Sequence, residues 1–573
     1  MSPTKSRSRA RKRRPMVFSD IMSVDRVSAP TVSPDGGSLA YVTTRASLDE
    51  NKMRSAINLI DLRTGEDRPL TPGPGSHSSP AWSPEGKDLA FVSDRGEDGS
   101  QVWVMPMDGG EASPVTCGKG GASNPVWSPD GTRIAFSRSV PVSPHLEGKG
   151  DDPSHQELYG LPNEHTTARV ETALLFRHWD HWRDMRRSHV FIVDVGTGTI
   201  EDVTPGDADV PPISLGGDQD FVFSPKGDEI AYVKNPDRVV ARSTNNSVFV
   251  QRLVGIKRKG RAVRVSDTKA CDSDPVYSPD GRYLAYLGCA KVGYEADRRR
   301  VKLHNRRTGK TVSLTEGLDR SAATLAFSQD GKHVLFLAQD RARIAVYRVP
   351  VGGGPTVQLT EGTTNSSLTV IPGSDDLIVG RESTISPVQL YRLTPGKGIP
   401  PIVTNGPAPK GTPKDAGAKA TQLTRHNPHL ARELEWSGIE DFWYKGADGD
   451  PVHGWLVKPP GFTAKRRWPM ALVIHGGPQS AFLDHFNYRW NLQMFAAQGM
   501  VAVQLNPRGS SGYGDTFQDQ ISGDWGGHCY DDIMAGVDHV LKRYRYIDPD
   551  RMVAAGASFG GFMVNWIAGH DDR

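Results

Sequence analysis

Trp127-Ser128-Pro129-Asp130-Gly131 is one copy of a short repeat that decides the fold of most of this chain. The serines of successive copies lie 50, 45, 96, 54 and 50 residues apart. Proline presets its own φ and glycine tolerates positive φ, so each copy predicts a tight turn between two strands. The other copies are Val32-Ser33-Pro34-Asp35-Gly36, Trp82-Ser83-Pro84-Glu85-Gly86, Phe223-Ser224-Pro225-Lys226-Gly227, Tyr277-Ser278-Pro279-Asp280-Gly281, Phe327-Ser328-Gln329-Asp330-Gly331 and a decayed seventh, Ile371-Pro372-Gly373-Ser374.

Each turn is followed by a short apolar segment typical of a buried strand, such as residues 39–42 and 284–287. A second pair of strands then ends at a threonine or serine, as at Thr71 and Ser266. Seven first halves and seven second halves predict a seven-bladed β-propeller over residues 16–427. We expect the aromatic residue before each turn to be buried against the next blade, so no blade would be stable alone.

Two segments interrupt the repeat. The first, residues 141–187, contains His178 and His181, whose spacing is compatible with a metal site. A metal site needs three or four placed ligands, so we interpret this segment as packing or as a loop at the rim. The second, residues 395–420, is rich in proline, glycine, lysine and alanine and predicts a mobile loop in the last blade.

Charge and cysteine content exclude several classes of protein. No apolar run approaches the roughly 18 residues of a membrane span. Four cysteines without a C-x-x-C pair predict reduced thiols and no metal centre. The net charge of +3 is unevenly distributed along the chain. The first fourteen residues include seven basic residues, and the rest of the chain has 62 basic and 66 acidic residues. We interpret residues 1–15 as a disordered basic tail, or Met16 as the true start, in preference to a nucleic-acid-binding arm.

After about Asn427 the pattern changes to alternating strands and helices, which predicts an α/β domain over residues 428–573. Strands are expected at residues 439–444, 452–457, 470–474, 500–505 and 552–555, and helices at residues 486–498, 530–544 and 562–568.

Gly556-Ala557-Ser558-Phe559-Gly560 fits a nucleophile elbow, in which a serine lies in a strained turn between a strand and a helix. The pattern alone is weak, but in this chain it lies between a predicted strand and a predicted helix. An earlier strand ends in Gly476-Gly477, where a second oxyanion amide is expected. We therefore favour a catalytic Ser558 over a buried structural serine.

The domain order and four motifs resemble the prolyl oligopeptidase family of serine peptidases, in particular its acylaminoacyl-peptidase and dipeptidyl-peptidase V branch. The motifs are His475-Gly476-Gly477-Pro478, Asn506-Pro507-Arg508-Gly509-Ser510-Ser511-Gly512-Tyr513-Gly514, Gly523-Asp524-Trp525-Gly526-Gly527 and Gly556-Ala557-Ser558-Phe559-Gly560-Gly561. The resemblance implies an α/β-hydrolase fold, a nucleophile at Ser558 and an oxyanion hole from the backbone amides of Phe559 and Gly477. It also implies a propeller that caps the site and limits substrates to short peptides, with residues 176–182 facing the central cavity.

One departure from this family is important. In the hydrolase fold the acid and the base follow the nucleophile along the chain, and only fifteen residues follow Ser558. His570 is twelve residues farther along a helix, about 18 Å at 1.5 Å per residue, whereas a base must lie within about 3 Å. His475 belongs to the oxyanion loop. We therefore expect a C-terminally truncated, inactive chain that lacks the triad Asp and His.

Two other functions remain open from the sequence: an inactive propeller binding protein, and nucleic-acid binding through the tail, which we disfavour. No cofactor or metal is expected, and neither is a membrane partner. Residues Val17-Phe18-Ser19-Asp20 do not form the apolar core of a secretory signal, so we expect a cytoplasmic protein. A carboxylate that holds a substrate amine could be Glu171, Asp180 or Glu295. The sequence leaves the released group and the oligomeric state open.

Overall fold

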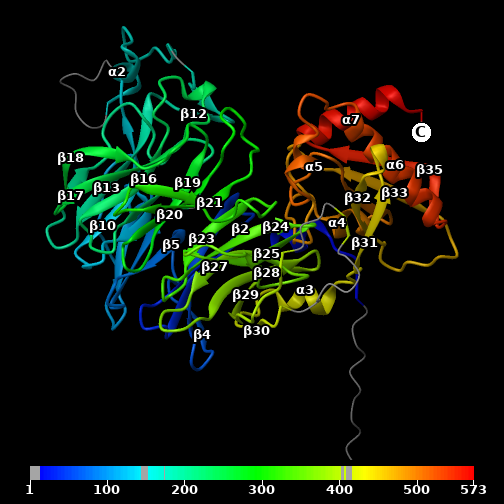
Figure 1. The fold of residues 1–573 in the computed structure, drawn as a ribbon, viewed down its shortest axis with the longest axis horizontal. Coiled ribbons are helices and arrows are strands. Elements are labelled where there is room, and N and C mark those ends of the chain that lie inside the picture. The colour runs from blue at the N-terminus through cyan, green and yellow to red at the C-terminus, as the bar shows by residue number, and fades with distance from the viewer. Residues whose placement is uncertain are drawn as a thin grey trace, which may run out of the picture.

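The structure is a computed structural model that describes residues 13–143, 153–172, 174–217, 219–401, 406–407 and 416–572. A large all-β part lies beside a smaller α/β part (Figure 1). Among the described residues, no helix is both long and apolar enough to cross a membrane.

The all-β part consists of four-stranded antiparallel groups in chain order. The first two groups are β1 (Arg26–Val32), β2 (Ser38–Ser47), β3 (Lys52–Asp61) and β4 (Asp67–Pro69), then β5 (His77–Trp82), β6 (Asp88–Ser93), β7 (Gln101–Pro106) and β8 (Ser113–Pro114). The third and fourth are β9 (Ser123–Trp127), β10 (Arg133–Pro141), β13 (Arg186–Asp194) and β14 (Ile200–Asp202), then β15 (Phe221–Phe223), β16 (Glu229–Lys234), β17 (Ser247–Val254) and β18 (Lys257–Arg264). The fifth is β19 (Asp272–Tyr277), β20 (Tyr283–Gly288), β21 (Arg300–Asn305) and β22 (Lys310–Ser313).

Two further groups share one sheet through a single parallel pair, Ile344 and Thr364. They are β23 (Ala322–Phe327), β24 (His333–Asp340), β25 (Arg343–Pro350) and β26 (Val357–Gln358), then β27 (Thr364–Val370), β28 (Leu377–Ser383), β29 (Ser386–Thr394) and β30 (Lys419–Gln422). The first strand of each group contacts the first strand of the next, and β27 contacts β1. The groups therefore close into a ring, a β-propeller.

The repeated turn explains why each group begins as it does. In its six copies the glycine has φ between 66° and 72°, a conformation that favours glycine. In five of the copies the serine hydroxyl accepts a hydrogen bond from the amide five positions later, as Ser33 does from the Ser38 amide at 2.9 Å. Later in each group a threonine or serine hydroxyl accepts from a backbone amide, as Thr71 does from Ile57 at 2.9 Å. These local bonds confirm the turn predictions.

The aromatic residue before the turn packs in the opposite direction from the one predicted. Trp82 donates through Nε1 to the Thr31 carbonyl at 3.1 Å, and Trp127 donates to the Ala81 carbonyl at 3.0 Å. Both contacts are with the preceding group. Trp82 packs with Val42 and Leu59, and Trp127 packs with Ala90 and Val102, so the side chain at this position points back toward the preceding group.

The insertion between β10 and β13 contains α2 (His155–Tyr159), β11 (Arg177–His178) and β12 (His181–Trp182). His178 and His181 face each other across this hairpin. Trp179 at its turn is 83% exposed. Within the described residues, no three His, Cys, Asp or Glu side chains are grouped so as to hold a metal ion. Of the predicted loop at residues 395–420, residues 402–405 and 408–415 lie outside the described residues.

The α/β part is a five-stranded sheet in the order β31-β32-β34-β33-β35, in which β33 is parallel to both of its neighbours. Its strands are β31 (Ile439–Lys445), β32 (Pro451–Val457), β33 (Trp468–Ile474), β34 (Val501–Asn506) and β35 (Ile547–Gly556). Its helices are α3 (Pro428–Glu433), α4 (Leu492–Ala497), α5 (Asp515–Asp519), α6 (His528–Arg543) and α7 (Phe559–His570), and short 3₁₀ turns are η2 (Val240–Arg242) and η3 (Ala447–Gly449).

Helices cover both faces of this sheet. Leu492 of α4 packs in one cluster with Ala502, whereas Ile533 of α6 packs in another with Val503. Because neighbouring residues of a strand point to opposite faces, α4 and α6 lie on opposite sides. The predicted strands are confirmed, and the helix expected at residues 486–498 is much shorter. The Asn487 side chain accepts a hydrogen bond from the Trp490 amide, and Asn491 caps the helix. Side-chain-capped turns at these two residues therefore take the place of the first half of the predicted helix.

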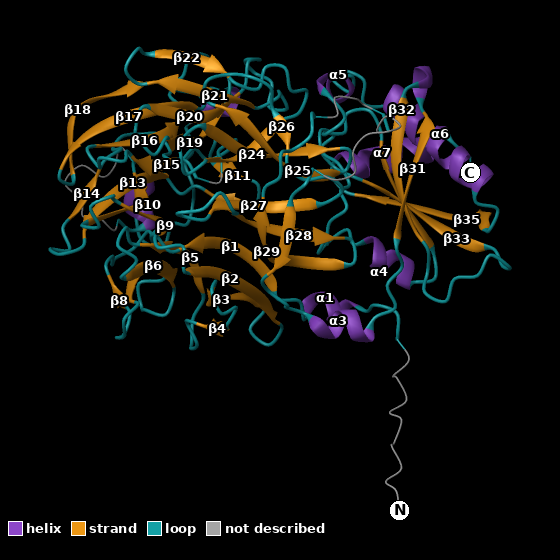
Figure 2. Ribbon diagram, turned by 60° about the horizontal axis from the view of Figure 1, so that its bottom comes forward, coloured by secondary structure: helices purple, strands orange, loops and turns teal. Residues whose placement is uncertain are grey.

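The described start of the chain packs on the α/β part. Arg14 bridges to Leu434 and its side chain pairs with Asp20 at 2.7 Å. Ile21 of α1 (Phe18–Met22) shares a buried cluster with α3 (Figure 2). Residues 1–12 of the predicted tail lie outside the described residues. The packing thus joins residues 14–24 to the α/β part, although the sequence interpretation assigned residues 1–15 to a tail and 16–427 to the propeller.

The tip of the β24–β25 hairpin connects the two parts. Ala342 is fully buried in the hydrophobic core of the α/β part, and its carbonyl accepts from the Asp484 amide at 2.9 Å. The Arg341 amide donates to the Gly512 carbonyl at 3.0 Å. Nearby, Glu382 of β28 accepts from the Phe486 amide at 3.0 Å.

This interface predicts a pH-dependent stability. Burial raises the pKa of Glu382 from 4.5 to about 7. Between these values the folded chain binds more protons than the unfolded chain, so the free energy of unfolding falls as the pH rises. One such group contributes up to about 1.4 kcal/mol per pH unit. Urea unfolding at pH 5, 6, 7 and 8 should show that the free energy of unfolding falls less steeply with pH in Glu382→Gln than in the parent. The substitution Glu111→Gln, at an exposed position, should leave this pH dependence unchanged. If Glu382→Gln has the same pH dependence as the parent, Glu382 is not its source.

Candidate active site

Ser558 lies between the end of β35 and the start of α7. Its φ of 56° and ψ of −124° place a non-glycine residue in a strained conformation, as expected for a nucleophile elbow. α7 begins at the next residue, so the N-terminus of this helix points toward the serine turn. Ser558 is exposed.

Close backbone contacts hold this turn. A Cβ atom on Gly556 would lie 2.5 Å from the carbonyl carbon of Gly560, and one on Gly560 would overlap the carbonyl oxygen of Ile474. Glycine is therefore required at both positions for α7 to pack against the end of β33. The sharp turn at Ser558 follows from that packing.

The Gly-Gly loop after β33 reaches the serine. A Cβ atom on Gly476 would lie 3.4 Å from the Cβ and 3.9 Å from the Oγ of Ser558. Gly477 has a φ of 126°. Neither its amide nor that of Phe559 donates a hydrogen bond within the described part of the chain. The structure thus brings the predicted nucleophile and the Gly476-Gly477 loop together, and neither predicted oxyanion amide has an acceptor among the described residues.

Neither histidine considered in the sequence is in place to act as the base. His475 is buried, with Nδ1 at 2.8 Å from the Gly476 carbonyl and Nε2 at 3.0 Å from the Ser510 hydroxyl. Burial lowers its pKa. His570 bonds to the Trp566 carbonyl at the far end of α7. Within the described ranges no side chain hydrogen-bonds to the Ser558 hydroxyl, which therefore has no base there.

A cavity of about 590 Å³ separates the propeller from the loops that follow β33 and β34. These loops contribute Gln479, Ser511 and Asp515 to its lining. Ser558 follows β35, which runs parallel to β33, so it lies at the same edge of the sheet. Ligands of α/β folds bind outside the carboxyl ends of such strands. The cavity lies at this edge of the sheet, although Ser558, Gly476 and Gly477 are not among its lining residues.

Of the three acids considered for amine binding, Glu295 lines this cavity. Glu171 lines a separate cavity within the propeller insertion, where Tyr159 donates to it at 3.2 Å. Asp180 lies beside His181 in the exposed hairpin. The cavity also contains Arg299, Arg320 and Gln339, which sequence reasoning did not identify. No local pattern marks them, because the ring of strands alone brings them to this opening.

Comparisons with known proteins agree with this geometry. Residues 485–573 match the family model described as prolyl oligopeptidase family, and residues 17–148 match the model of the TolB beta propeller domain. The chain is 30% identical over 560 residues to a dipeptidyl-peptidase 5 of Porphyromonas gingivalis, and the match covers 96% of this chain and 76% of that protein. It is 29% identical to a dipeptidyl-peptidase 5 of Trichophyton tonsurans with the same coverage.

Solved structures show the same fold at lower identity. An acylaminoacyl peptidase in complex with Z-Gly-Gly-Phe-chloromethyl ketone matches with a TM-score of 0.75 and 19% identity, over 97% of this chain and 77% of that one. A puromycin-hydrolyzing peptidase of Mycobacterium tuberculosis matches with a TM-score of 0.65 and 15% identity, over 98% and 78%. These likenesses confirm the predicted architecture of a propeller followed by an α/β-hydrolase domain.

The elbow packing predicts a specific response to a single methyl group. Gly560→Ala should destabilise the α/β part by about 1 to 3 kcal/mol, because its Cβ overlaps the Ile474 carbonyl. Gly569→Ala, in the last turn of the same helix, meets no atom within 4 Å and should be neutral or slightly stabilising. Thermal unfolding of the two variants measures this difference. Equal midpoints would show that the turn does not depend on this contact.

Proposed function

This chain belongs to the prolyl oligopeptidase family of serine peptidases, and we propose that Ser558 is the nucleophile that cleaves short peptides. The observation that carries the proposal is the strained turn at Ser558, held by Gly556 and Gly560 with Gly476 against the serine. A strained non-glycine residue is costly, by roughly 1 to 3 kcal/mol, and persists where the surrounding packing demands it. The strained turn exposes the serine hydroxyl at the end of the parallel strands, where it can react with a substrate.

In the proposed reaction the Ser558 Oγ attacks the scissile carbonyl carbon while a base takes its proton. The amides of Phe559 and Gly477 donate to the oxyanion of the tetrahedral intermediate. The peptide C–N bond then breaks as the base returns the proton to the leaving amine. Water hydrolyses the resulting ester and restores the serine.

The substrate would enter the cavity between the two parts, where the propeller limits its length. The relatives named dipeptidyl-peptidase 5 and acylaminoacyl peptidase favour release of a dipeptide or of an acylated residue from the amino end of a peptide. Glu295 is the one of the three candidate acids that lines this cavity, and its carboxylate is suited to a free amine. An acylated substrate has no such amine and would not need it.

The base and the acid that orients it are proposed to be a His and an Asp that follow Arg573 in a longer form of the protein. The chain spans about three quarters of the length of the curated relatives it matches. The lack of a hydrogen-bond partner for the Ser558 hydroxyl among the described residues also favours the alternative, an inactive propeller binding protein. The strained serine turn opposes that alternative, because binding by a propeller has no use for it.

A cytoplasmic location stays a prediction, and the four cysteines are free thiols in the structure.

An activity assay separates these two functions. The 573-residue chain should hydrolyse chromogenic dipeptidyl and acylaminoacyl substrates no faster than its Ser558→Ala variant, because no described side chain hydrogen-bonds to the Ser558 hydroxyl as a base would. A longer form that includes the coding sequence beyond Arg573 should be active, and Ser558→Ala should reduce its kcat by at least about a thousandfold. Rates on the two substrate types also identify the released group.

Two results would contradict the proposal. Serine-dependent turnover by the 573-residue chain would place the base among its own residues. An inactive longer form that folds normally would support the binding protein instead.

A further inference from the structure

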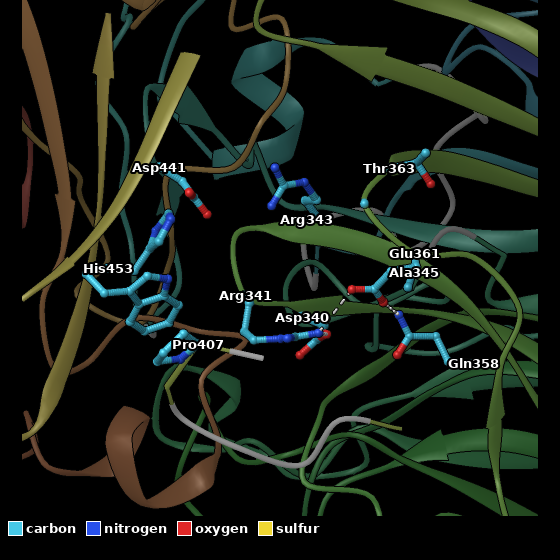
Figure 3. Close-up of a pocket in the computed structure, with 12 residues that line it drawn as sticks. Asp340, Arg341, Arg343, Ala345, Gln358, Glu361, Thr363, Pro407, Asp441 and His453 are labelled. Atoms are coloured by element: carbon cyan, nitrogen blue, oxygen red, sulfur yellow. Dashed lines mark hydrogen bonds and ion pairs between the residues drawn. The ribbon is translucent and has the colours of Figure 1, made fainter. Parts of the chain in front are cut away.

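A second cavity, of about 300 Å³, lies on the other side of the β24–β25 hairpin tip. Its walls come from β25 of the propeller and from β31 and β32 of the α/β part (Figure 3). Gln339 and Ile344 of the hairpin line the cavity near Ser558, whereas Arg341 and Arg343 line this one. Nothing in the proposed reaction uses it.

His453 presents a buried donor to this cavity. The Asn506 Nδ2 donates to the Phe482 carbonyl at 3.1 Å and to the Tyr513 hydroxyl at 2.9 Å, and that hydroxyl donates to His453 Nδ1 at 2.9 Å. The Asn506 amide is oriented by the Phe482 amide, which donates to its oxygen at 2.8 Å. Nδ1 therefore accepts, and in the neutral ring the proton is on Nε2.

The Nε2 atom is buried and has no partner among the described residues, and the whole side chain is 1% exposed. Burial lowers the pKa of this ring to about 3, so it stays neutral. His453 lines the cavity, whereas Asn506 and Tyr513, which lie at its Nδ1 edge, do not. A buried donor without a hydrogen-bond partner costs free energy, which indicates that an acceptor belongs beside Nε2.

Arg343 supplies a second donor group from the propeller side. Its Nε is buried and unpartnered within the described chain, and no described carboxylate lies within ion-pair distance of its guanidinium. The guanidinium carbon lies 5.1 Å from the centre of the Trp455 ring, which limits its motion. A planar guanidinium with free N–H groups is suited to a carboxylate.

Asp441 supplies the opposite charge from β31. Figure 3 shows its carboxylate pointing toward Arg343 across the cavity, without an interaction joining them. Asp441 is exposed and forms no ion pair with any described residue. Glu361, on the propeller side, is already bonded to Gln358 and lies 3.5 Å from Arg341. Among the described residues that line the cavity, Arg343 and Asp441 are thus the cation and the anion without an ion-pair partner.

We propose that this cavity binds a small zwitterion of the size of a dipeptide, with its carboxylate on Arg343 and His453 Nε2 and its ammonium group on Asp441. A cavity of about 300 Å³ is at the lower end of the range for small-ligand sites. Arg343 on the propeller wall and Asp441 on the facing wall match the two ends of such a molecule, and His453 lies on the same wall as Asp441. The proposal goes beyond the peptidase reaction and rests on the cavity's own chemistry.

Calorimetric titration of glycylglycine into the Ser558→Ala chain tests this without hydrolysis of the probe. Binding should weaken at least tenfold in Arg343→Gln. N-acetyl-glycylglycine and glycylglycinamide, each lacking one charge, should also bind at least tenfold more weakly. Asp441→Asn should remove the preference for the free amine over the acetylated form, because the ammonium group loses its partner.

Two controls make the result decisive. Arg348→Gln, on the same strand but outside the cavity, should bind as the parent does. Arg299→Gln alters the cavity near Ser558, so loss of binding there instead would place the probe at that cavity and overturn the proposal. The absence of binding in the parent would overturn it as well. Thermal unfolding of each variant shows whether it is folded, and the exposed Asp441→Asn substitution tests the site even if Arg343→Gln is unstable.

Discussion

The insertion of one hairpin tip, residues 340–343, into the α/β part is the contact on which the arrangement of both cavities depends. Arg341 and Ala342 have φ values of 45° and 61°, so both central residues of this two-residue turn have positive φ without being glycine. Below the tip, Arg320 and Asp340 form an ion pair that is almost entirely buried. A turn of this cost is retained because it joins the propeller to the loops that follow β33 and β34.

That contact places different chemistry on the two sides of the hairpin. On one side the propeller faces the edge of the sheet where Ser558 and the Gly476-Gly477 loop lie. On the other side Arg343 faces Asp441 and His453.

Local patterns predicted the features whose energy is local. The Ser-Pro-Asp-Gly turns were predictable because glycine φ and the serine hydroxyl bond involve neighbours in sequence. The elbow at Ser558 was predictable for the same reason, since Gly556 and Gly560 meet within one turn. The helix expected from residue 486 begins only at Leu492, because Asn487 and Asn491 bond to nearby backbone amides. The prediction that Trp82 packs on the next blade was wrong, because its partner depends on contacts between blades and not on neighbouring residues in the sequence.

The sequence by itself determined the repeat, the order of the two domains and the serine turn, because each is built from residues that interact across a few positions. Only the tertiary structure decided which side chains share a cavity. Arg343, Asp441 and His453 carry no common motif, and their meeting depends on how the sixth blade packs against β31 and β32. The same holds for Glu295 and Arg299, which ring closure brings opposite Gln479 and Ser511. Long-range packing sets these distances, and no local preference of the chain encodes them.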